Sequence, residues 1–144
     1  MYQKTLISVA GGLWALMMTQ LLAAQSLTIT LENVKESSGT IMLQLMHGEA
    51  EFKGEAAAFA SYLQRAQQGT MTFQSNNLPN GEYAVRIMHD LNGNGELDTN
   101  FVGMPTEPWA MSNNARGHFG PPTWKQVKFT VSGESVSQTI KLSK

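Results

Sequence analysis

Residues 82–89 read EYAVRIMH, and this stretch decides the fold class. Tyr83, Val85, Ile87 and His89 occupy alternate positions, so an extended chain places all four on one face. A Leu-Pro-Asn-Gly turn signature at 78–81 comes directly before them. An apolar set with a period of two, rich in β-branched and aromatic residues, predicts a half-buried β-strand.

The same alternation recurs along much of the chain. Residues 26–34 (SLTITLENV) and 40–47 (TIMLQLMH) are separated by a Ser-Ser-Gly turn and predict an opening hairpin. Further strands are predicted at 69–73, 124–131 and 136–142. Residues 49–68 differ, because their apolar side chains fall at helical spacing with Gly69 as a stop signal, which predicts one short amphipathic helix.

These elements predict an all-β fold. Six to seven short strands with turn signals, one short helix and one long ordered loop are typical of an antiparallel, immunoglobulin-like β-sandwich. A small open barrel is the alternative fold.

Composition narrows the function classes. The chain has 144 residues, with Lys+Arg 10, Asp+Glu 11 and no cysteine. The near-neutral charge argues against a nucleic-acid-binding module, which normally carries a basic stripe. Without cysteine there is no disulfide, no zinc-thiolate site and no cysteine nucleophile.

The N-terminal residues have the layout of a secretory signal peptide. Lys4 precedes an uncharged apolar run, and the small residues Ala23 and Ala24 follow it. The run is shorter than the roughly 20 residues of a transmembrane helix, which is the alternative interpretation. We therefore predict a signal peptide at 1–24, a single mature domain at 25–144, a periplasmic or secreted location, and no transmembrane anchor after cleavage.

Residues 90–122 predict a long loop that contains four of the five prolines. Loops of this length in a compact domain are usually functional or disordered. Because Phe101, Trp109 and Phe119 lie in it, we expect an ordered, functional loop. A short strand is expected around 101–103.

The loop opens with DLNGNGELD, a candidate calcium site. Oxygen-bearing side chains recur at alternate positions, Gly95 permits a sharp turn, and the Glu96 carbonyl supplies a further oxygen, as hard cations require. The twelfth position of an EF-hand loop needs a bidentate Glu, but Phe101 stands there. A metal-free polar turn is the alternative, since Asn-Gly sequences favour tight turns. The candidate metal ligands are Asp90, Asn92, Asn94, Glu96 and Asp98.

The second half of the loop interleaves polar and aromatic side chains. Such a mixture offers stacking faces and amide hydrogen bonds for a ligand, a sugar for example. The alternative is that the amides and the arginine satisfy loop backbone groups while the aromatic side chains anchor the loop. The candidate binding residues are His89, Glu107, Trp109, Asn113, Asn114, Arg116 and His118.

An enzyme is the less favoured class. His89 and His118, with Glu107 as a partner, suggest a small hydrolase or lyase. However, the chain has no Gly-x-Ser-x-Gly, no His-Glu-x-x-His and no phosphate-binding glycine loop before a helix.

Residues 78–124 carry a pattern that resembles a bacterial family of exported proteins known only as a domain of unknown function. The pattern comprises a Gly-x-Tyr-Ala-Val strand, His-Asp-x-Asn-Gly-Asn-Gly, Gly-x-Pro-x-Glu and Ser-Asn-Asn-Ala-x-Gly, here at 81–85, 89–95, 103–107 and 112–117. The resemblance implies an exported β-sandwich similar to transthyretin-like and carboxypeptidase-regulatory-like domains. It implies no activity.

These observations predict a non-catalytic binding or structural module of the bacterial envelope, with calcium as a candidate stabiliser. The expected partner is an unidentified ligand, either a carbohydrate or an envelope protein, and not a nucleic acid.

Overall fold

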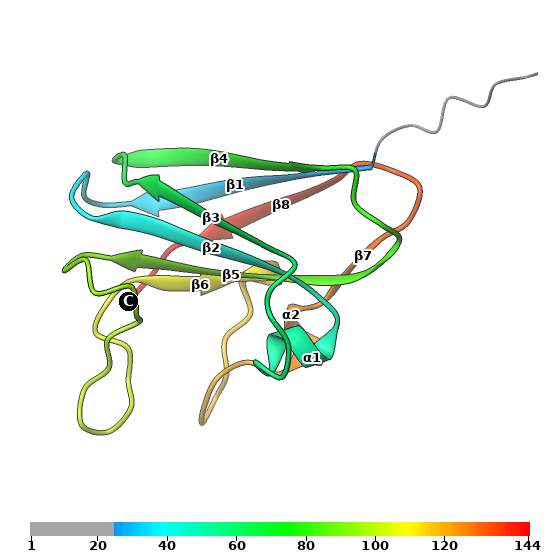
Figure 1. Cartoon of the computed structure of the whole chain (residues 1–144). Coiled ribbons are helices and arrows are strands. Elements are labelled where there is room, and N and C mark those ends of the chain that lie inside the picture. Colours follow the sequence, from blue (N-terminus) through cyan, green and yellow to red (C-terminus); the bar gives the residue numbers. More distant parts are fainter. Residues whose placement is uncertain (1–24) are drawn as a thin grey trace, which may run out of the picture.

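The computed structural model describes residues 25–144, so the predicted signal peptide lies outside the described residues. Two β-sheets pack face to face (Figure 1). One contains β4 (Gly69–Asn76), β1 (Ser26–Val34) and β8 (Val136–Lys141), in that order. The other runs β3 (Ala60–Arg65), β2 (Thr40–His47), β5 (Gly81–Asp90) and β6 (Trp109–Met111), with β7 (Phe129–Val131) also paired to β5. This arrangement confirms the predicted β-sandwich.

The core lies between the two sheets and is built from the alternating residues. From Leu27 to Leu31 in β1 and from Ile41 to Leu45 in β2 every second side chain is buried, as the period of two requires. In β5 the inward face carries Tyr83, Val85, Ile87 and His89, all at most 1% exposed. The strand that decides the fold class therefore lies at the centre of the five-stranded sheet, between β2 on one side and β6 and β7 on the other.

The predicted opening hairpin is wrong. β1 pairs with β4 and, in parallel, with β8, whereas β2 pairs with β3 and β5. Each strand buries one face. The two strands lie in different sheets, so their buried faces pack against each other across the core instead of lying side by side in one sheet. The parallel β1–β8 pair is a departure from a purely antiparallel sandwich.

The predicted helix at 49–68 is also wrong. Only α1 (Glu49–Phe52) is helical, and Gly54 follows it with a φ of +76°. Residues 60–65 instead form β3, which pairs with β2 along its whole length. Hydrogen bonding to the open edge of β2 outweighs the helical propensity of the alanine-rich run, since propensity is a weak preference that tertiary context overrides.

The remaining differences fall near the long loop. No strand forms at 101–103, which is an exposed turn, while β6 was not predicted. The predicted strand at 124–131 divides into α2 (Trp124–Val127) and β7. A single 3-10 turn, η1 (Ser112–Asn114), follows β6. Among the described residues no helix is long and apolar enough to span a membrane.

Two loops project from the same side of the molecule, below the sheets in Figure 1. The first, residues 91–108, connects β5 to β6, and the second, residues 115–123, connects η1 to α2. We call them the 91–108 loop and the 115–123 loop.

Candidate functional site

The base of the 91–108 loop is organised around two buried carboxylates. Asp90 is 3% exposed, and its two oxygens accept hydrogen bonds from the backbone N–H groups of Gly93 (2.7 Å) and Gly95 (2.8 Å). Glu107 is 4% exposed and accepts from the N–H groups of Leu91 (2.8 Å) and Asp98 (3.1 Å). Four backbone donors therefore compensate the two charges, and the carboxylates fix the path of the loop.

Three of the five calcium-ligand candidates meet in this loop, but two of them do so as nitrogen donors. Asn92 and Asn94 both turn their amide nitrogens toward Asp98, with Nδ2 to Oδ distances of 2.5 and 2.8 Å. Their own oxygens accept from backbone N–H groups two residues further on. Glu96 is exposed. Calcium requires oxygens, so this arrangement does not fit the ion unless both amides rotate. Among residues 25–144 no group of three or more His, Cys, Asp or Glu side chains is placed to hold a metal.

The three candidate catalytic side chains occupy different environments. His89 is 1% exposed, and its Nε2–H donates to the carbonyl of Ser38 at 2.7 Å, because a carbonyl can only accept. Glu107 accepts hydrogen bonds from backbone N–H groups at the base of the 91–108 loop. His118 is exposed on the 115–123 loop. No hydrogen bond among the described residues joins any two of the three. His89 lines a hollow of about 130 Å³, with Lys35 and Lys144 on its wall, which Glu107 and His118 do not line.

Asn113 and Asn114 connect the two sheets. The Asn113 amide donates to the carbonyls of Gln126 (3.0 Å) and Lys128 (2.9 Å). The Asn114 amide pairs with β8 as a strand would, donating to Thr139 O (2.9 Å) and accepting from Lys141 N (2.8 Å). Both asparagines have left-handed backbones, with φ of 61° and 51°. Their amides thus satisfy backbone groups of neighbouring elements.

Ser112 occupies the buried centre of this connection. It is 0% exposed; its hydroxyl accepts from Val85 N at 2.9 Å and donates to Val127 O at 2.6 Å. The Ser-Asn-Asn segment therefore joins β5, α2 and β8, which are distant in sequence.

Arg116 stacks on Trp109, with its guanidinium carbon 4.0 Å from the ring centroid. Its Nη2 donates to the Trp109 carbonyl at 3.1 Å and also contacts the Ser143 hydroxyl. Partial burial lowers the pKa of Arg116 through desolvation. The pair holds the start of the 115–123 loop against the edge strand β6.

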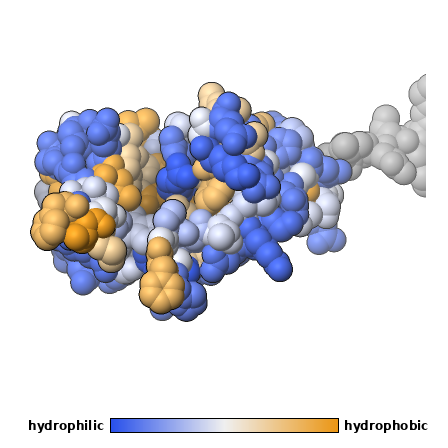
Figure 2. Space-filling view, turned by 90° about the horizontal axis from the view of Figure 1, so that it is seen from below, coloured by the Kyte–Doolittle hydropathy of each residue, from blue (hydrophilic) through white to orange (hydrophobic). Residues whose placement is uncertain are grey.

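Each loop ends in an apolar tip. In the first tip, residues 99–105, Phe101 is 99% exposed, and Val102 and Met104 are also exposed. In the second tip, residues 117–120, Phe119 is 106% exposed. Figure 2, which views the molecule from the side of the loops, shows a hydrophobic patch at the end of each loop. Phe101 and Phe119 therefore do not anchor the long loop, as one interpretation of the sequence held.

Both tips are tightly built turns. In the first, the Asn100 side chain accepts from the N–H groups of Val102 (3.1 Å) and Met104 (3.0 Å), and its backbone N–H donates to Met104 O at 2.8 Å. In the second, Gly117 approaches Gly120 so closely that an added Cβ would lie 1.8 Å from the Gly120 carbonyl oxygen. The apolar side chains are exposed because these turns point them outward.

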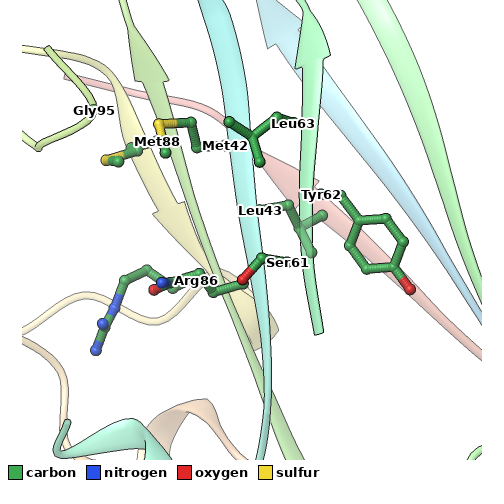
Figure 3. A pocket seen from close by; sticks show the side chains of 9 residues that line it. Met42, Leu43, Ser61, Tyr62, Leu63, Arg86, Met88 and Gly95 are labelled. Carbon is green, nitrogen blue, oxygen red and sulfur yellow. The ribbon is translucent and has the colours of Figure 1, made fainter. Parts of the chain in front are cut away.

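Between the loops and β3, the outer face of the five-stranded sheet carries an apolar row. Leu63, Met42, Met88 and Trp109 are successive cross-strand neighbours on β3, β2, β5 and β6. A hollow of about 100 Å³ opens on this face, lined by Met42, Leu63, Met88 and Arg86 and by Gly95 of the 91–108 loop (Figure 3). Burial lowers the pKa of Arg86 through desolvation, and its Nη2 donates to Phe52 O at 3.0 Å.

The sequence analysis named the residues whose hydrogen bonds build the two loops. It missed most of the apolar residues that the loops and the outer face of the sheet expose. Among the predicted binding residues, Trp109 and His118 lie on or beside the exposed apolar surface. Val102, Met104 and the outward residues of β2 and β3 were not predicted. An available signal was the absence of any charge from 99 to 106, a run of eight residues in a surface loop.

The comparison with protein families identifies the chain. It belongs to the family described as "Uncharacterized protein conserved in bacteria (DUF2141)", whose model matches residues 29–139. This match confirms the family resemblance seen in the sequence. Neither a curated protein nor a solved structure gives a significant match to the chain.

Proposed function

We propose that this chain is an exported, non-catalytic binding module of the bacterial envelope. Its binding face would comprise the two loop tips and the apolar row on the outer face of the five-stranded sheet. The observation that carries the proposal is the presentation of fully exposed Phe101 and Phe119 on tightly hydrogen-bonded or close-packed turns. Apolar side chains that gather on an exposed surface often mark an interaction site.

Export is supported by the signal-peptide layout of residues 1–24. Intact-mass measurement of the protein recovered from the periplasm or the medium is expected to give a chain that begins at or near Gln25. A full-length chain retained in the inner membrane would contradict export.

The binding face is tested by site-specific photocrosslinking in the source bacterium. A benzoylphenylalanine at position 101 or 119 is expected to give covalent adducts, because both positions would contact the partner. Gln74, exposed on β4 of the opposite sheet, is the matched control and is expected to give none. Equal labelling from all three positions, or no adduct from any, would contradict the proposal.

The hydrolase or lyase alternative has less geometric support, because His89, His118 and Glu107 are not joined and two of them are engaged in structural hydrogen bonds. Turnover in a broad hydrolase screen that is lost in His89→Ala or His118→Ala would favour it over the binding module.

Calcium binding at the loop base is a second, separate proposal. It is supported by the ligand spacing of residues 90–98 and by the convergence of Asn92 and Asn94 on Asp98. It requires both amides to turn their oxygens inward. Thermal melts with and without the ion test it.

A further inference from the structure

We propose that the partner of the two tips is the surface of a phospholipid bilayer, into which Phe101, Val102, Met104 and Phe119 insert. This inference rests on the proposed function, since it takes the tips to be the binding face. It makes the protein a peripheral, reversible membrane binder of the envelope.

The chemistry of the tips matches the interfacial region of a bilayer. Residues 99–105 contain no ionisable side chain, and residues 117–120 contain only His118. Aromatic side chains favour the headgroup boundary, and apolar side chains gain free energy when they leave water. A charge within a tip would oppose insertion; the carboxylates that flank the first tip, Asp98 and Glu107, are both engaged in hydrogen bonds within the loop.

The shape of the face also favours a bilayer. Both loops project from the same side of the molecule and reach beyond the helices there (Figure 1). Their ends are separate apolar points with polar surface between them (Figure 2). A stable protein interface buries about 800 Å² on each partner with close shape complementarity. A bilayer surface has no fixed shape that the protein must complement, so the two loop tips can insert into it independently.

The turns reduce the conformational entropy that the backbone of each tip loses on insertion. Asn100 holds the first tip in one backbone conformation, and the close approach of Gly117 to Gly120 defines the second. Because the backbone of each tip is already fixed, binding has to immobilise only the side-chain rotamers.

The surrounding charge predicts the lipid preference. Glu96 and Asp98 lie in the same loop as the first tip, and the one cation beside the second tip, Arg116, is stacked on Trp109 and hydrogen-bonded to its carbonyl. Anionic lipids therefore offer no electrostatic gain, and insertion of apolar groups supplies the affinity. We expect binding to phosphatidylcholine vesicles to equal or exceed binding to vesicles that also contain phosphatidylglycerol, with little dependence on salt.

The experiment measures sedimentation of the mature exported protein with vesicles of these two compositions. Phe101→Ala and Phe119→Ala are each expected to weaken binding about tenfold. The double variant is expected to weaken it by roughly the product, because the residues lie on separate loops. Gln74→Ala is the control and is expected to bind as the unaltered protein does. Thermal melts check that each variant is folded.

A fluorescent label gives a second readout. The chain has no cysteine, so Val102→Cys can be labelled at one position with an environment-sensitive dye. Its emission is expected to shift to the blue and to intensify on adding vesicles, whereas a dye at Gln74→Cys is expected to stay unchanged.

The outcomes separate this inference from the proposed function. Vesicle binding that is lost in the tip variants supports both. No vesicle binding, with photo-adducts to a protein at positions 101 and 119, overturns the lipid partner and leaves the binding face intact. Neither vesicle binding nor adducts overturns both. Vesicle binding that survives the double variant, or that requires anionic lipid, overturns insertion of the tips.

Discussion

The base and the tip of the 91–108 loop differ in which side chains they bury and which they expose. At the base, Asp90 and Glu107 are almost fully buried, and every carboxylate oxygen accepts a backbone N–H. At the tip, Phe101 is 99% exposed and contacts solvent instead of the fold. Polar groups are inside and apolar groups are outside, the reverse of the usual distribution.

This contrast separates folding from binding. A buried carboxylate is tolerable only when hydrogen bonds replace its hydration, so the base is specific in sequence and geometry. An exposed apolar side chain adds little to folding stability, and in the proposed function the tip side chains contact the partner instead. The motif residues Asp90 and Glu107 thus fix the path of the loop, and the Phe101 side chain takes no part in fixing it.

The largest effect is expected for Asp90→Ala at the base. The substitution removes the buried carboxylate that accepts from the N–H groups of Gly93 and Gly95, and with it two charge-assisted hydrogen bonds. We expect the free energy of unfolding to fall by about 3 kcal/mol in urea titration. Glu96→Ala, an exposed acid in the same loop, is the matched control and is expected to change it by less than about 0.5 kcal/mol. Equal effects of the two changes would contradict the role assigned to the base.

A smaller effect is expected for Asn114→Ala, which removes the two hydrogen bonds to β8 and leaves a left-handed residue with a Cβ. The loss is expected to be about 2 kcal/mol, of which about 1 kcal/mol is backbone strain. Asn114→Gly also removes the hydrogen bonds, but glycine adopts the left-handed backbone without strain. It is therefore expected to be less destabilising than Asn114→Ala by the strain of about 1 kcal/mol. If glycine were as harmful as alanine, the left-handed backbone would not contribute.

A calcium ion bound after rotation of the Asn92 and Asn94 amides would act on the base and not on the tip. With a dissociation constant of roughly 1 mM, typical of the weakest extracellular sites, about 10 mM Ca²⁺ would stabilise the fold by about 1.4 kcal/mol. The melting temperature would then rise by several degrees, Mg²⁺ would do less, and Asp98→Ala would abolish the rise. Coincident melts in EDTA and in Ca²⁺ would show that hydrogen bonds alone close the loop.

The smallest stability effect is expected at the tip. Phe101→Ser is expected to change the free energy of unfolding by less than about 0.5 kcal/mol, because the side chain packs against nothing. The measurement is urea unfolding beside the Asp90 variant. A loss of more than about 1 kcal/mol would show that the tip packs on the fold in solution and would remove the distinction between base and tip.

Sequence reasoning was successful where a pattern is local. The alternation in 82–89 correctly placed Tyr83, Val85, Ile87 and His89 on the buried face. The polar spacing of 90–98 marked a segment in which Asn92 and Asn94 both hydrogen-bond Asp98, while calcium binding there stays a prediction. Local patterns persist because neighbouring residues on a strand or a tight turn are placed by backbone geometry alone.

It failed where the outcome depends on distant partners. The helical spacing of 49–68 gave no sign that Ala60–Arg65 would meet the open edge of β2. The turn between β1 and β2 gave no sign that the two strands would join different sheets. Which backbone edge is free, and what lies across the core, are properties of the assembled chain.

By itself, then, the sequence determined the β-sandwich class, the inward face of β5, the family and the polar composition of the loop base. Only the tertiary structure decided that Asn113 and Asn114 join the sheets, that Asn92 and Asn94 present nitrogen to Asp98, and that Phe101 and Phe119 project from one side. The reason is that periodicity fixes which face a side chain takes, whereas exposure and hydrogen-bond partners depend on what the rest of the chain brings to that face.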